Sequence, residues 1–197
     1  MKYSILDFEV KKVVSKKHTK MNRIKQYFLR LRLRYQKSKQ TISRKTLNYE
    51  QATKIGFLFF TTNTGMSTAI NRFMKGLLEE GKKVDALSYM LEHNQNPYGF
   101  KYDICTEQQI NWLGAIVNPK IQEFIQTEYD YLYCIAVEKC EVIDYILKNS
   151  HAKCRIGYFD GKNADNFELM MQLQNGEDVD KLIEQMLYYT KKTLVAN

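Results

Sequence analysis

Residues 54–90, KIGFLFFTTNTGMSTAINRFMKGLLEEGKKVDALSYM, decide the fold. The run at residues 55–60 is apolar without alternation and too short for a helix, which is typical of a strand covered on both faces. Gly81 lies where a helix ends in the left-handed conformation, and a second strand begins at Val84. Between the strands, one helical stripe holds Ile70, Phe73, Met74, Leu77 and Leu78. This strand–helix–strand unit predicts a right-handed parallel crossover.

The sequence beyond residue 90 continues to alternate short apolar runs with amphipathic helical segments. Thr106 and Gln109 have the spacing of a helix capping box, and Asn118 before Pro119 is a typical helix start. Further strands are predicted at residues 100–105, 130–137, 152–159 and 167–173, and further helices start near residues 118, 142 and 178. This order predicts an α/β fold, a three-layer Rossmann-like sandwich with a mostly parallel sheet of five or six strands.

The charge of the chain is divided unevenly. Residues 1–50 carry 15 Lys and Arg against three acidic residues, a net charge of +12, whereas residues 51–197 carry a net charge of −4. We therefore predict a basic N-terminal arm over residues 1–49 and an α/β domain over residues 50–197. Such asymmetry favours a polyanionic partner, either nucleic acid or an anionic membrane surface.

Composition narrows the class of protein further. Hydrophobic residues make up 44% of the chain and aromatic residues 13%, which excludes a wholly disordered chain. No apolar run approaches the roughly 18 residues of a transmembrane helix, and Asp7 and Glu9 interrupt the apolar patch at the start, which makes a poor secretory signal. Cys105, Cys134, Cys140 and Cys154 have no C-x-x-C spacing, which favours buried reduced thiols over a metal or redox site. We expect a cytoplasmic protein without a metal or a cofactor.

Within the arm, the residues from Met21 onward predict a basic amphipathic helix. One helical face holds Ile24, Tyr27, Phe28, Leu31 and Tyr35. The run at residues 29–35 also alternates with period two, as an edge strand would, but the longer stripe and the good helix formers favour a helix. Arginine makes bidentate phosphate contacts, and nearby aromatic rings can stack on unpaired bases. The candidate nucleic-acid-binding residues are Arg23, Lys25, Tyr27, Arg30, Arg32, Arg34, Tyr35 and Lys37.

Four functions are compatible with this arm. We favour a non-catalytic association with RNA or the ribosome, in which the arm contacts a phosphate backbone and releases counterions. A peripheral membrane role would use the same amphipathic helix in a lipid interface. The helix could instead dock on its own domain or on a protein partner. The fourth alternative is a phosphate- or nucleotide-binding α/β enzyme with its site at the carboxyl ends of the strands.

Those strand ends offer a few polar candidates for a small ligand. They are Thr61, Thr62, Asn63, Thr64 and Ser67 after the first strand, and Glu138 and Asp160 after later strands. A phosphate at the helix start is one interpretation, but simple capping of the helix by Thr64 or Ser67 is favoured, because neither G-x-G-x-x-G nor a P-loop is present. Charges at strand ends are also ordinary solubility features. His18, His93 and His151 are scattered, and no catalytic motif appears, so an enzyme is not favoured.

Six short segments at strand entries and turns form a recognisable set. They are IGFLFF at 55–60, GKKV at 81–84, NWLG at 111–114, YDYL at 129–132, RIGY at 155–158 and FELM at 167–170. Together they resemble an uncharacterised family of small Bacteroidota proteins, over roughly residues 50–190. The resemblance implies a bacterial cytoplasmic setting. The family has no assigned activity, so the resemblance carries no catalytic residues across.

Overall fold

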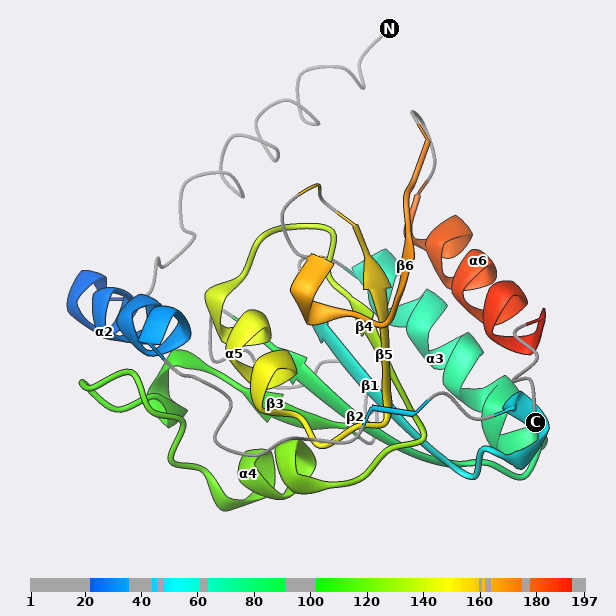
Figure 1. Ribbon diagram of the computed structural model, residues 1–197, viewed down its shortest axis with the longest axis horizontal. Coiled ribbons are helices and arrows are strands. Elements are labelled where there is room, and N and C mark those ends of the chain that lie inside the picture. The colour runs from blue at the N-terminus through cyan, green and yellow to red at the C-terminus, as the bar shows by residue number, and fades with distance from the viewer. Residues whose placement is uncertain are drawn as a thin grey trace, which may run out of the picture.

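The computed structural model describes residues 22–35, 44–45, 48–60, 64–90, 102–159, 161, 164–174 and 178–192. The strands of this described chain are β1 (Lys54–Phe60), β2 (Lys83–Tyr89), β3 (Asp103–Cys105), β4 (Tyr131–Ile135), β5 (Cys154–Tyr158) and β6 (Leu169–Met171). They form one sheet in the order β3-β2-β1-β4-β5-β6, and every pairing is parallel (Figure 1). The predicted Rossmann-like sandwich is confirmed.

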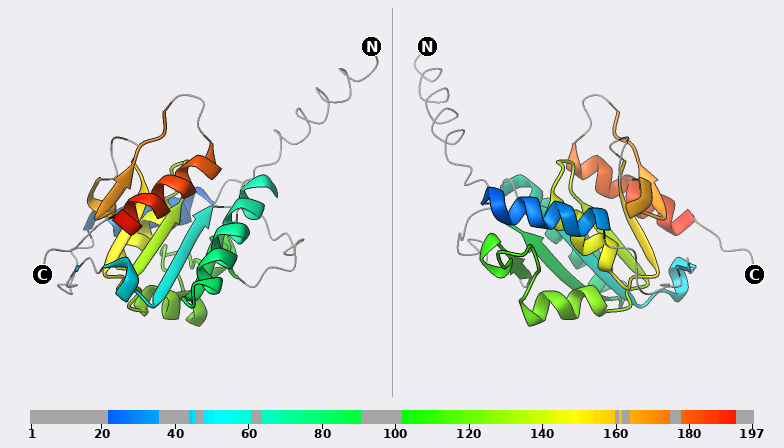
Figure 2. Two further views of the ribbon diagram at one scale, coloured as in Figure 1. Left: turned by 90° about the vertical axis from the view of Figure 1, so that its right-hand side faces the viewer. Right: turned by 60° about the vertical axis from the view of Figure 1, so that its left-hand side comes forward.

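Helices cover both faces of the sheet. The α-helices are α2 (Arg23–Tyr35), α3 (Thr64–Glu79), α4 (Pro119–Gln126), α5 (Glu141–Asn149) and α6 (Val179–Lys192). Short 3-10 helices are η1 (Tyr49–Gln51), η2 (Glu107–Gln109) and η3 (Ala164–Asn166). α3 and α6 pack on one face, whereas α4 and α5 pack on the other, with α2 lying against α5 (Figure 2).

The central strands are buried on both faces, as their unbroken apolar runs predict. On one face, the Phe57 ring stacks on Tyr133 at 5.4 Å and meets Phe73 of α3 edge-to-face at 5.1 Å. On the other face, Leu58 and Leu132 pack with the apolar residues of α4 and α5. Aromatic pairs of this kind contribute about 0.5–1.5 kcal/mol beyond the area that they bury.

The predicted helix signals also have their expected local causes. The Thr106–Gln109 capping box is formed in both directions, and Asn118 Oδ1 accepts hydrogen bonds from the backbone N–H groups of Lys120 and Ile121. Gly81 has a φ of +78°, the left-handed conformation expected at the end of α3. The predicted apolar stripe of α3 is wrong at one residue. The helix packs through Ile70, Phe73 and Leu77, and Leu78 is exposed.

The strand order reverses between β1 and β4, which are neighbours in the sheet. The chain leaves β1 into α3 on one face and leaves β4 into α5 on the opposite face. In open α/β sheets, ligands bind beside such a reversal, at the carboxyl ends of the strands. The same arrangement places the segment after β4 next to α5 and α2.

Asp130 ties the amino ends of three neighbouring strands together. Its Oδ2 accepts hydrogen bonds from the backbone N–H groups of Thr53 at 2.8 Å and Lys54 at 3.0 Å, and its Oδ1 pairs with Lys153 Nζ at 2.7 Å. Burial raises the pKa of Asp130, but the hydrogen bonds from Lys153, Lys54 and Thr53 outweigh it and hold that pKa below its ordinary value.

Replacing Asp130 with asparagine is expected to lower the free energy of unfolding by about 2–3 kcal/mol at neutral pH, because an amide cannot satisfy the backbone donors and the lysine together. A depressed pKa contributes stability above the ordinary pKa of about 3.9, and this contribution is lost as the pH falls through the folded-state value. The difference in the free energy of unfolding between parent and variant should therefore become smaller in acid. Urea unfolding from about pH 7 to about pH 2 measures it. Asp103→Asn, which removes the exposed carboxylate that pairs with Lys120, is the matched control and should change little.

Candidate nucleic-acid interface

The predicted basic helix is formed as α2, and it is docked on the α/β domain. Leu29 is fully buried, and Leu33 packs against the core formed with α5. The backbone of α2 approaches Gly114 so closely that a Cβ there would lie 2.5 Å from the Leu29 nitrogen. Gly114 has a φ of +70°, so both the turn and the close approach require glycine.

The face of α2 that docks on the domain is not the longer apolar stripe of its sequence. Ile24 and Tyr27 are each 60% exposed and Tyr35 is 74% exposed, whereas Leu29 and Leu33 face the domain. The helix has two apolar faces about half a turn apart, and the shorter one docks. Of the longer stripe, Ile24, Tyr27 and Tyr35 therefore lie on the outside of the molecule, whereas Phe28 and Leu31 are half-buried.

Polar contacts from Asn22, Lys25 and Arg30 hold α2 against the domain. The Arg30 Nε and Nη2 atoms donate to Glu141 Oε1 at 2.9 and 2.7 Å. Lys25 Nζ donates to the Glu107 backbone carbonyl at 3.1 Å, and the Asn22 N–H donates to the Glu107 carboxylate at 2.9 Å. Burial raises the pKa of Glu141, but hydrogen bonds that include those from Arg30 and Gln26 lower it overall, so the carboxylate stays charged opposite the arginine.

A tight turn beside α2 places an unexpected aromatic residue on the surface. Ile110 and Ile116 pair as an antiparallel bridge, so the chain reverses direction between them. Asn111 Oδ1 accepts hydrogen bonds from the N–H groups of Leu113 at 3.0 Å and Ala115 at 2.9 Å, which fixes the turn. Trp112 lies in this turn and is 65% exposed, whereas Ile110 is buried.

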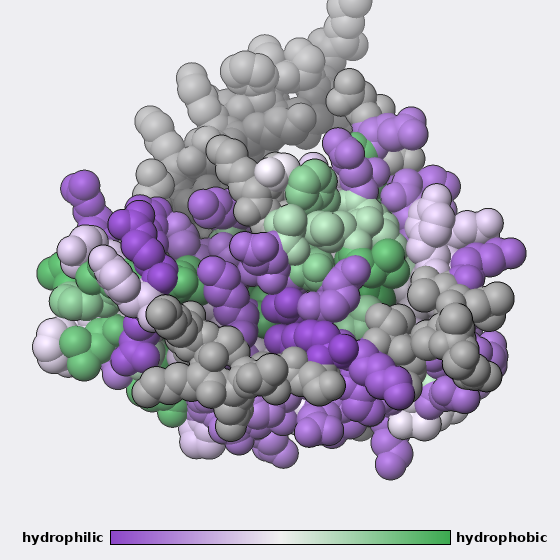
Figure 3. Space-filling view, viewed as in Figure 1, coloured by the Kyte–Doolittle hydropathy of each residue, from purple (hydrophilic) through white to green (hydrophobic). Residues whose placement is uncertain are grey.

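The outer face of α2 and this turn together form one surface, called here the aromatic–basic surface. Its exposed members are Arg23, Ile24, Tyr27, Arg34, Tyr35, Trp112, Leu113 and Val117. Figure 3 shows apolar and hydrophilic side chains interleaved at the end of the molecule where α2 and the turn lie. Among the described residues, no ion pair engages Arg23 or Arg34. The surface therefore presents guanidinium groups beside exposed rings.

The predicted phosphate-binding residues of the arm divide into two groups. Lys25, Arg30 and Arg32 are engaged with the domain, Arg32 through a hydrogen bond from Nε to the Leu113 carbonyl at 3.0 Å. Arg23, Tyr27, Arg34 and Tyr35 form the second group, and they lie exposed on the aromatic–basic surface. Lys37 lies outside the described residues.

The candidate small-ligand residues are only partly placed. Thr61, Thr62, Asn63 and Asp160 lie outside the described residues, and Thr64 and Ser67 lie in the first turn of α3, where side chains are not described. Glu138 is exposed in the segment between β4 and α5. Of the predicted set, it is the residue that borders a described cavity.

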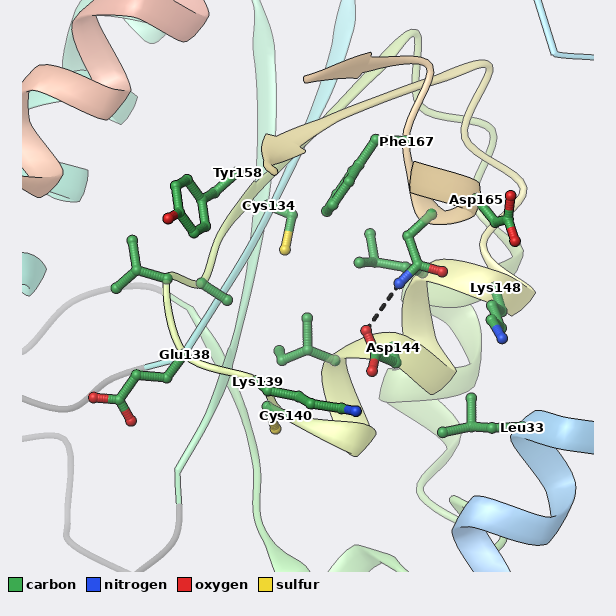
Figure 4. Close-up of a pocket in the computed structure, with 15 residues that line it drawn as sticks. Leu33, Cys134, Glu138, Lys139, Cys140, Asp144, Lys148, Tyr158, Asp165 and Phe167 are labelled. Carbon is green, nitrogen blue, oxygen red and sulfur yellow. Dashed lines mark hydrogen bonds between the residues drawn. The ribbon is translucent and has the colours of Figure 1, made fainter. Parts of the chain in front are cut away.

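That cavity lies at the carboxyl ends of β4 and β5 and has a volume of about 150 Å³. Leu33 of α2 contributes to one side, and α5, the segment after β4 and the η3 region contribute the others (Figure 4). Asn166 Nδ2 donates to Asp144 Oδ1 at 2.8 Å within it. Its charged lining mixes both signs, with Glu138, Asp144 and Asp165 against Lys139 and Lys148. This mixture does not define one class of ligand.

All four cysteines are free thiols. Burial raises the pKa of Cys105 and of Cys140 to about 12 each, with Cys140 adding a smaller electrostatic contribution at Cys105. Burial also raises the pKa of Cys134. Thiols with raised pKa values are poor nucleophiles at neutral pH. Across the described ranges, no three His, Cys, Asp or Glu side chains gather as a metal site.

Sequence reasoning missed Trp112, Glu107, Glu141 and Gly114 as residues that shape this surface. The one available signal was the single tryptophan of the chain, placed between Asn111 and Gly114 in a segment rich in turn formers. The partners of Arg30 and Lys25 could not be identified, because they lie 111 and 82 residues away along the chain.

No helix in the described part of the chain is long and apolar enough to cross a membrane.

Three comparisons with known proteins bear on the identity of the chain. Neither the curated proteins nor the solved structures include a match to this chain. One family model, described as a family of unknown function, matches residues 25–193, which run from the first turn of α2 to just beyond α6. The chain therefore belongs to this family of unknown function, DUF6913.

Proposed function

We propose that the protein binds RNA, free or in the ribosome, through the aromatic–basic surface, without catalysing a reaction. The observation that carries the proposal is the pair of exposed guanidinium groups, Arg23 and Arg34, held beside exposed Tyr27 and Tyr35 on a helix that is fixed to the domain. Arginine binds phosphate in a bidentate manner, and tyrosine rings stack on bases. The net charge of +12 over residues 1–50 adds long-range attraction to a polyanion.

The docking of α2 strengthens this proposal. A helix ordered in advance does not lose its conformational freedom on binding, so more of the contact free energy appears as affinity. Lys25 and Arg30 orient the helix through Glu107 and Glu141, which neutralises their own charges locally. We therefore assign phosphate contact to Arg23 and Arg34, and the anchoring of α2 to Lys25, Arg30 and Arg32. This division narrows the set of residues that the sequence suggested.

The double variant Arg23→Gln, Arg34→Gln is expected to bind RNA more weakly and to flatten the log–log dependence of the association constant on salt by about 0.7 per lost contact. Fluorescence anisotropy with a labelled RNA oligonucleotide over a salt series measures both effects. The matched control is Arg72→Gln with Lys75→Gln, which removes the same charge from exposed positions on α3, on the opposite face of the sheet. If the two doubles bind alike, with equal slopes, the assignment of α2 as the phosphate-binding element is wrong.

An anionic membrane surface is the second candidate. Ile24, Leu113 and Val117 are exposed beside Trp112, and an interfacial helix needs apolar side chains of this kind next to basic ones. Cosedimentation of the full chain with phosphatidylserine vesicles, in parallel with the RNA titration, separates the two candidates. Binding to vesicles without binding to RNA would replace the RNA proposal.

A bacterial cytoplasm is the setting that we propose for this activity. The resemblance to Bacteroidota proteins supports a bacterial source. Free thiols at all four cysteines are typical of a reducing compartment, which the cytoplasm provides.

A further inference from the structure

We infer that the aromatic–basic surface takes single-stranded RNA, with Trp112 as a platform on which an unpaired base stacks. This inference rests on the proposed RNA binding and adds to it the strandedness of the ligand and a residue outside the basic arm. It follows from the position, support and exposure of Trp112.

The turn that carries Trp112 is built to hold its shape. The Asn111 N–H donates to the Ala115 carbonyl at 2.9 Å, and the Gly114 N–H donates to the Asn111 carbonyl at 3.0 Å. Arg32 joins the turn to α2 through the Leu113 carbonyl. The backbone on both sides of Trp112 is therefore fixed by hydrogen bonds and by a neighbouring helix.

Among the described residues, Phe28 is the aromatic neighbour that supports the indole ring. Phe28 meets Trp112 at a centroid distance of 6.2 Å and an interplanar angle of 85°, and Tyr27 meets Phe28 at 5.6 Å and 76°. An edge-to-face contact orients a ring without stacking on it. Tyr27, Phe28 and Trp112 thus form a series across the join between α2 and the turn, with the first and last members well exposed.

This exposure is not explained by folding. An indole buried in the core contributes stability, whereas Trp112 leaves most of its surface in water, and no hydrogen bond engages it within the described part of the chain. Exposed rings beside guanidinium groups fit a ligand with flat faces and negative charge, which describes unpaired nucleotides. In a duplex the base faces are stacked on one another, so a ring on the protein surface cannot reach them.

Trp112 is the one tryptophan of the chain, so its fluorescence reports directly on this inference. Titration of the full chain with a single-stranded RNA oligonucleotide should lower the tryptophan fluorescence, because a base stacked on the indole quenches it. A duplex of the same length should bind more weakly and leave the emission nearly unchanged. If phosphatidylserine vesicles shift the emission maximum to shorter wavelength and RNA does not quench the emission, the inference is overturned, and Trp112 contacts lipid instead.

A variant series separates the stacking role from the phosphate role. Trp112→Ala is expected to weaken single-stranded RNA binding by about tenfold, within the range for one base–aromatic stack, and Trp112→Phe should recover part of the loss. Tyr188→Ala removes another exposed ring, from α6, and is the matched control. If RNA binding depends on Arg23 and Arg34 but Trp112→Ala binds RNA as tightly as the parent, the stacking inference is wrong and the proposed RNA binding stands. If the parent binds no RNA, both the stacking inference and the proposed function are wrong.

Discussion

Replacing Gly114 with alanine is expected to lower the free energy of unfolding by about 3 kcal/mol and to loosen α2 from the domain. An L-residue in the left-handed conformation costs about 1–2 kcal/mol. The new methyl group would lie 2.5 Å from the Leu29 nitrogen and 2.8 Å from its Cα, so the α2 backbone must move. Movement exposes Leu29, whose full burial contributes about 1.5–3 kcal/mol. Denaturant unfolding and amide exchange across α2 measure the two effects.

Gly81 supplies a control that isolates the packing effect. Its φ is +78°, close to that of Gly114, but apart from the adjoining residues no atom lies within 4 Å of the position that a Cβ would occupy. Gly81→Ala should therefore show only the conformational cost and leave amide exchange in α2 unchanged. Equal losses of stability in the two variants, with equal protection of α2, would mean that the close approach of helix and turn does not stabilise the docked arm.

The central sheet could be predicted from the sequence because its signals are local. The uniform apolar run of β1, the capping box at Thr106 and the start of α4 at Asn118 each depend on residues a few positions apart. These contacts form within one element or between consecutive elements. Local pattern is therefore sufficient to predict the alternation of strands and helices along the chain and the α/β class of the fold.

The docking of α2 could not be predicted in this way. Its sequence contains two apolar faces, one with Ile24 and Tyr27 and one with Leu29 and Leu33, and the longer face is the stronger pattern. Two distant residues decide which face packs inward. Gly114 leaves room for the α2 backbone, and Glu141 pairs with Arg30. Both residues lie far from α2 along the chain, so tertiary contacts decide which face of α2 packs on the domain. The division of the arginines into anchoring and exposed groups follows from that choice.

Replacing Glu168 with glutamine is expected to lower the free energy of unfolding by about 3 kcal/mol, because it leaves a buried cation without its counter-charge. Arg155 is buried, and its Nε and Nη2 donate to Glu168 Oε2 at 3.1 Å and Oε1 at 2.7 Å. The Arg155 guanidinium also donates to the carbonyls of Leu147 and Asp165, which border the cavity beside β5. Arg44 shares the same carboxylate at 3.9 Å. Burial, followed by the nearby charge of Arg155, lowers the pKa of Arg44, so two cations depend on one acid.

A double-mutant cycle makes this second prediction specific to the charge pair. In an Arg155→Met background, Glu168→Gln should cost much less than in the parent, because the main unpaired cation has been removed with its partner. Urea unfolding at neutral pH measures all four proteins. Glu184→Gln, which removes an exposed acid paired with Lys181 at 3.2 Å, is the surface control and should lie within about 0.5 kcal/mol of the parent. Equal costs of Glu168→Gln in the two backgrounds would show that Glu168 acts through its bond to the Arg155 backbone N–H, at 2.7 Å, and not through the buried charge.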